Sequence, residues 1–129
     1  MTHRTAQADQ AADVHQWPPD IEGMRATVAR LIGPDDAPDV LPPPADEVAI
    51  LTSTLRGHLQ LLIPEVDAVA RKQPANDIPR YCALACIGEA KGKLSAEPRP
   101  GYGGAVAYAR RLARVLGALC DHYETLGKN

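Results

Sequence analysis

The sequence predicts an all-α protein, a four-helix antiparallel bundle that follows a disordered N-terminal tail. From Asp46 to Leu126, apolar residues recur in three long stripes at the spacing of a helix. Short breaks marked by Pro or Gly separate these stripes. The chain has no Phe and one Trp, so its core must be built from Ala, Leu, Val and Ile. Its 129 residues suffice for one such core, and we expect one domain over residues 20–129.

The composition of the N-terminal region changes at Trp17, from polar residues to a sequence with helical apolar spacing. Residues 1–16 are polar and lack a sustained apolar period, which predicts a flexible tail over residues 1–19. Asp20 is a suitable N-cap for a first helix. The apolar stripe of this helix consists of Ile21, Met24, Val28, Leu31 and Ile32. Gly33 and Pro34 end the helix, and residues 34–44 form an extended, Pro-rich linker.

A second helix is expected over residues 46–72. Asp46 and Glu47 lie in its first turn and Arg71 in its last, where each charge favours the helix dipole. Its stripe runs unbroken across Pro64 and consists of Val48, Leu51, Leu55, Leu59, Leu62, Val66 and Val69. That register favours one helix kinked at Pro64, and a break there is the alternative.

Two further helices complete the bundle. The third begins at Asn76 or Asp77 and ends near Ala96, before Pro98 and Pro100. Its centre, residues 81–87, has no polar face, which predicts that it is the most buried helix. The fourth follows the glycine-rich residues 101–104 and runs to Leu126.

Short connections make the last three helices antiparallel neighbours. Residues that are far apart in the sequence therefore lie at the same height, that is, at the same position along the bundle axis. His58 lies level with Glu89, and Glu89 with Arg111; Tyr108 is one turn from Arg111. One interpretation is a buried polar network that sets the helix register. The alternative is a ligand-binding or acid/base site formed by His58, Glu89, Tyr108 and Arg111.

A second layer contains all the cysteines. Cys82, Cys86 and Cys120 lie at one height, with His122 nearby. Zinc accepts mixed Cys and His ligands, but free cysteines commonly pack as small apolar side chains. We therefore predict packing and assign no metal ligand.

Arginines gather around the glycine-rich entry to the fourth helix. They are Arg99, Arg110, Arg111 and Arg114. They form either a solvated face or an anion site at a helix N-terminus. No nucleotide-binding motif accompanies them, so no cofactor is expected and the catalytic residues are unknown.

Composition argues against several classes of protein. A net charge of −2 and a pI near 6.0 make nucleic-acid binding unlikely. No apolar run is long enough to cross a membrane, and the N-terminal residues lack the apolar centre of a signal peptide, so a cytoplasmic location is expected.

Three segments carry a resemblance to a known group of proteins. They are LRGHLQLLIPEVDAVA (55–70), PRYCALACIGEAKGKL (79–94) and GYGGAVAYARRLARVLGALCDHYETL (101–126). The chain resembles short actinobacterial proteins, chiefly of streptomycetes, that are uncharacterised or associated with natural-product biosynthesis. The resemblance implies a cytosolic accessory protein and carries no catalytic residues. Together with the absence of a catalytic motif, it leads to the hypothesis of a non-enzymatic module that acts through protein contacts as a homodimer.

Overall fold

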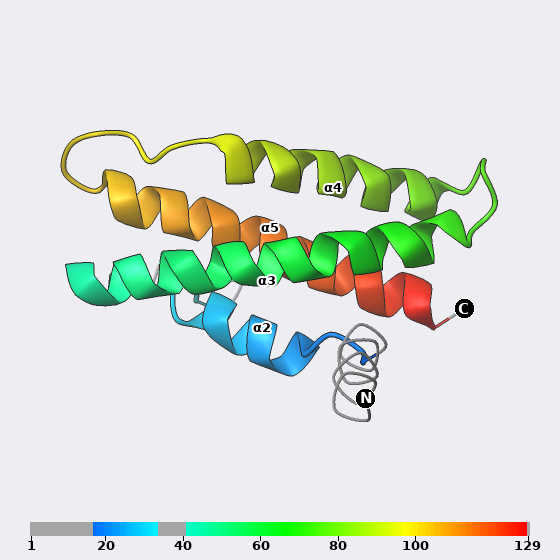
Figure 1. The fold of residues 1–129 in the computed structure, drawn as a ribbon, viewed down its shortest axis with the longest axis horizontal. Coiled ribbons are helices and arrows are strands. Elements are labelled where there is room, and N and C mark those ends of the chain that lie inside the picture. Colours follow the sequence, from blue (N-terminus) through cyan, green and yellow to red (C-terminus); the bar gives the residue numbers. More distant parts are fainter. Residues whose placement is uncertain (1–16, 34–40, 129) are drawn as a thin grey trace, which may run out of the picture.

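The computed structural model confirms the all-α bundle. It describes residues 17–33 and 41–128. Four helices are seen there: α2 (Ile21–Ala29), α3 (Ala45–Arg71), α4 (Ile78–Ser95) and α5 (Gly104–Gly127). The three long helices lie side by side with alternating directions, and the short α2 packs against α3 and α5 (Figure 1). The flexible tail predicted over residues 1–19 and the linker over 34–44 lie largely outside the described residues.

Local sequence determines where the helices begin. Asp20 caps α2 by accepting a hydrogen bond from the Gly23 N–H at 2.9 Å. Asp77 caps α4 in the same way through the Arg80 N–H at 3.0 Å. Both N-caps confirm the sequence prediction. The cap residue of α5 is Gly103, whose φ of 80° is favourable only for glycine.

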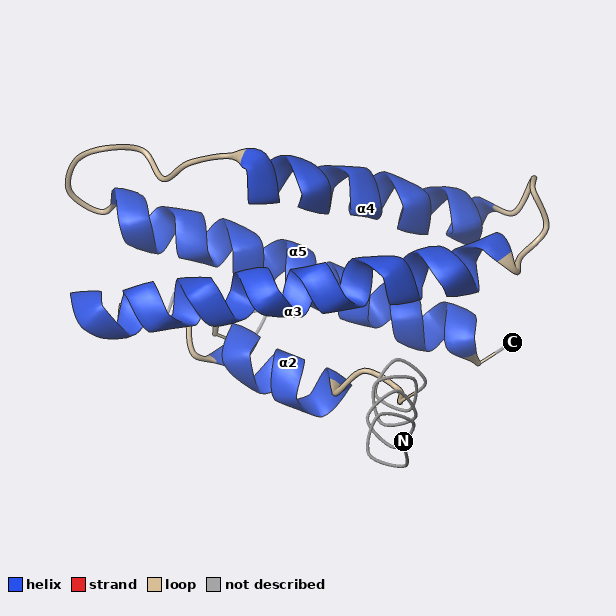
Figure 2. Cartoon of the chain, in the orientation of Figure 1, coloured by secondary structure: helices blue, strands red, loops and turns tan. Residues whose placement is uncertain are grey.

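Pro64 lies inside an uninterrupted α3, so the single helix is confirmed and the alternative of two helices is not (Figure 2). The side chains on one side of α3 explain this continuity. Leu55, Leu59, Leu62 and Val66 are all fully buried and span the proline. Burial of a continuous apolar face outweighs the loss of one backbone hydrogen bond.

The core is apolar throughout the described residues, which contain no buried polar or charged residue apart from Tyr108 and the cysteines, counted with the apolar core. It forms around α3 and α5, each of which contacts the other three described helices. The largest fully buried side chains of α5 are Leu112, Leu116 and Leu119. The centre of the bundle is therefore formed by α3 and α5, not by α4.

The prediction that the third helix is the most buried is wrong. Within the described structure α4 contacts α3 and α5 but not α2 (Figure 1). Two neighbours cover one side of a helix, so Ala83, Cys86, Ile87 and Ala90 are buried while Tyr81 remains 74% exposed. The absence of a polar face in residues 81–87 indicates an uncovered apolar surface.

Candidate functional site

The four residues of the predicted site lie in three different environments. Glu89 of α4 and Arg111 of α5 line one pocket. His58 of α3 faces α2, where its Nε2 lies 3.3 Å from the hydroxyl oxygen of Thr27. Tyr108 of α5 is buried in the interior, with 2% of its surface exposed. Ligand binding at these positions stays a prediction, but the expected single buried layer does not form.

Tyr108 joins three helices through its hydroxyl group. This group accepts a hydrogen bond from Arg56 of α3 at 2.6 Å and donates one to the Lys93 carbonyl of α4 at 3.0 Å. A buried hydroxyl that both donates and accepts is fully satisfied. Tyr108 therefore has a structural environment, and its contact with Lys93 agrees with the predicted antiparallel register of the last two long helices.

His58 is half-buried and has a partner on α2. The Thr27 hydroxyl donates to the Gly23 carbonyl at 3.1 Å, which leaves the Nε2–H of His58 to donate to the Thr27 oxygen. Burial lowers the pKa of His58, and the nearby Asp20 carboxylate raises it in part. The imidazole is thus held in its neutral form at the α2–α3 contact.

Glu89 is exposed, which corrects the expectation that its carboxylate is withdrawn from water. The reason is geometric. An antiparallel register specifies the height of a residue along the bundle but not the side of the helix on which it lies. The side chain of His58 contacts α2, whereas that of Glu89 lines a pocket between α4 and α5, so the two leave their helices in different directions.

The cysteines also separate. Cys86 and Cys120 are buried, and burial raises the pKa of each thiol to about 11, whereas Cys82 is exposed. The predicted packing holds for the two buried thiols. Among the residues that the structure describes, no group of three or more His, Cys, Asp or Glu side chains is placed to hold a metal ion.

The arginines of α5 have different roles. Arg110 donates a hydrogen bond from Nε to the carbonyl of Leu31, just after α2, at 3.2 Å, and so connects this part of the chain to α5. Arg111 and Arg114 line the pocket that also contains Lys93 and Glu89. Sequence reasoning singled out Arg111 and Arg114 but missed Lys93, whose position one turn after Glu89 places both side chains on the same side of α4.

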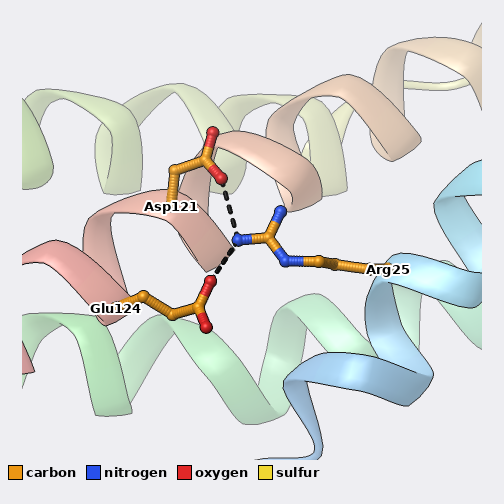
Figure 3. A network of polar contacts seen from close by, with 3 residues as sticks. All are labelled: Arg25, Asp121 and Glu124. Atoms are coloured by element: carbon orange, nitrogen blue, oxygen red, sulfur yellow. Dashed lines mark hydrogen bonds and ion pairs between the residues drawn. The ribbon is translucent and has the colours of Figure 1, made fainter. Parts of the chain in front are cut away.

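Arg25 forms an ion-pair network that the sequence did not indicate. Its guanidinium contacts the carboxylates of Asp121, at 2.8 Å, and Glu124 (Figure 3). The two acids are three residues apart and lie on the same side of α5. They raise the pKa of Arg25. The network is exposed and fixes α2 against the C-terminal half of α5.

The fold and these contacts define a small helical-bundle protein with charged pockets between its helices. A family model described as a family of unknown function (DUF6415) matches residues 22–128, and the chain belongs to this family. No curated protein and no solved structure matches the chain. Among the described helices, none has both the length and the apolar character needed to cross a bilayer.

Proposed function

We propose that this protein is a non-enzymatic interaction module that forms a homodimer through the outward side of α4. An accessory or regulatory role, in the actinobacterial natural-product setting that the resemblance implies, is part of the same proposal. The observation that carries it is the uncovered apolar surface of α4. A helix without a polar face is normally surrounded by other helices, and α4 is covered on one side only.

We call this surface the α4 outer face and define it by five exposed residues: Ile78, Tyr81, Cys82, Ala85 and Gly88. Ile78 and Tyr81 are each 74% exposed. These five residues carry no charge, and the last two are small. The exposed Glu89, one turn after Ala85, borders the face. Small residues allow another helix to approach closely, and an exposed apolar surface of this kind favours association.

Charge favours a second copy of the chain as the occupant. In a twofold dimer each face meets its own copy, so a charged face would meet like charges. The α4 outer face limits this repulsion, because none of its five defining residues is charged. An 18-residue helix is about 27 Å long, so the contact is at the small end of specific interfaces. We therefore expect an equilibrium that depends on concentration.

Sedimentation velocity of the full chain tests this proposal. The mass should rise from that of a 13.8 kDa monomer toward twice that value as the concentration increases from about 1 μM to about 1 mM. Tyr81→Glu and Ala85→Glu place a charge against its own copy and should keep the chain monomeric.

The matched controls are Ile50→Glu and Leu61→Glu. These residues of α3 are 67% and 66% exposed, and neither lies on the α4 outer face. They should dimerise like the unmodified chain. A monomer at every concentration, or equal loss of dimer in the controls, would overturn the proposal and leave a different protein as the partner of this face.

A further inference from the structure

A pocket of about 200 Å³ lies between α4 and α5. Its lining consists of Glu89, Lys93, Arg111, Arg114, Val115 and Ala118. Lys93 and Arg111 are half-buried, while Glu89 and Arg114 are more exposed. The pocket thus combines charged groups at its mouth with apolar side chains from α5.

The charges of the pocket are unbalanced. Three cationic groups share it with one carboxylate, so its formal charge is +2. Elsewhere in the described structure Arg25, Arg30 and Arg71 each form an ion pair with a carboxylate. Lys93, Arg111 and Arg114 form no such pair within the described residues. A positive charge gathered in a recess attracts a small anion.

The arrangement of these groups suits a phosphate. Arg111 and Arg114 are three residues apart and lie on the same side of α5, while Lys93 comes from the facing helix. Guanidinium groups bind phosphate oxygens through paired hydrogen bonds, and an ammonium adds a point charge from the second side. A phosphate dianion would neutralise the formal charge of +2 in the pocket.

The apolar lining indicates that the ligand has a carbon group as well. Val115 is 4% exposed and lies beside Ala118 in the lining of the pocket. Arg114 and Ala118 also line a groove of about 720 Å³ between α2 and α5, whose walls include Val28, Ile32 and Gly117. A carbon group that extends from the phosphate therefore has apolar surface to cover.

We propose that this pocket binds a small organic phosphate monoester. Lys93, Arg111 and Arg114 hold the phosphate group, and Val115 and Ala118 contact the adjoining carbon atoms. Glu89 opposes anion binding and lowers the formal charge of the pocket to +2. Lys93, Arg111 and Arg114, which hold the phosphate, are not residues of the α4 outer face, so phosphate binding can be tested separately from the proposed dimer.

Phenyl phosphate is a suitable probe, titrated into the full chain and followed through the methyl NMR signals of Val115 and Ala118. We expect saturable shifts at millimolar concentrations or below. Arg111→Gln, Arg114→Gln and Lys93→Gln should each weaken binding about tenfold or more, as loss of a charged hydrogen bond does. Glu89→Gln should strengthen binding, because it removes the opposing charge.

Two matched controls remove the same charge elsewhere. Lys91→Gln alters a lysine two positions from Lys93, on a different side of α4, and Arg71→Gln alters a paired arginine at the end of α3. Both should bind phenyl phosphate like the unmodified chain. Inorganic phosphate should bind more weakly because it lacks the carbon group, and uncharged phenol should not shift these signals.

The proposal fails if phenyl phosphate leaves the Val115 and Ala118 signals unchanged. It also fails if inorganic phosphate binds as tightly as phenyl phosphate, or if the control variants lose affinity as much as the pocket variants do. Sedimentation of the pocket variants should match that of the unmodified chain, so failure of this proposal can be told apart from failure of the dimer.

Discussion

The side chain of Tyr108 is held by burial and by two hydrogen bonds. Its hydroxyl group bonds both Arg56 and the Lys93 carbonyl, and its ring is almost fully buried. Sequence reasoning selected Tyr108 because of its height beside Arg111. The structure shows that the same position lets one hydroxyl connect α3, α4 and α5.

Tyr108→Phe should therefore reduce stability. The substitution keeps the ring but leaves the Arg56 donor and the Lys93 carbonyl without this partner, which costs about 1–3 kcal/mol. Urea denaturation measures the change in the free energy of unfolding. Tyr102→Phe is the control, because Tyr102 is fully exposed, and it should change stability by less than about 0.5 kcal/mol. Equal effects of the two substitutions would show that the buried hydrogen bonds contribute nothing.

Among the elements, α3 shows how packing overrides local preference. Pro64 cannot donate a backbone hydrogen bond to the Gln60 carbonyl. The helix nevertheless continues, because buried apolar side chains lie on both sides of the proline, Leu62 before it and Val66 after it.

Pro64→Ala should accordingly stabilise the protein. Alanine restores the donor and removes the ring from the preceding turn, and the gain approaches the helix-propensity difference of about 3 kcal/mol, less the entropy that proline removes from the unfolded chain. Thermal unfolding followed by circular dichroism would record a higher midpoint. Ala68→Pro, at an exposed position four residues further on, should lower it strongly. A lower midpoint for Pro64→Ala would mean that the proline is required by the shape of α3.

The elements also show what the sequence could predict. Asp20 and Asp77 mark helix starts by local chemistry, so these positions were predictable. The positions of Glu89 and Arg111 along the bundle axis could be predicted because the connection between α4 and α5 is short. The direction of each side chain around its helix did not, because it depends on which neighbours cover the helix. That is why His58 faces α2 instead of Glu89, and why the centre of α4 is exposed at Tyr81.

For the whole molecule, the lowered pKa of His58 predicts how stability depends on pH. The folded state disfavours the charged imidazole, whose ordinary pKa is 6.5, so the unfolded chain takes up the proton first as the pH falls. The stabilisation that comes from the neutral imidazole should be complete above pH 6.5 and should be lost progressively as the pH falls below 6.5. His58→Gln should remove this part of the pH dependence.

The measurement is the free energy of unfolding between pH 7.5 and pH 5, compared between the unmodified chain and His58→Gln. The Asp20 carboxylate favours the charged form of His58. The chain with Asp20→Asn should therefore lose more stability at low pH than the unmodified chain does. If the curves of the unmodified chain and His58→Gln run parallel, the imidazole is not held in its neutral form.

The short α2 has one further consequence for the molecule. It is a nine-residue helix with Met24 as its buried residue, while α3, α4 and α5 all contact one another without it. Local opening with a free energy below that of global unfolding is expected for such a peripheral segment. Detachment of α2 would break the Arg25 ion pairs and expose apolar side chains of α3 and α5. The helix α2 therefore acts as a removable cover over part of the apolar core.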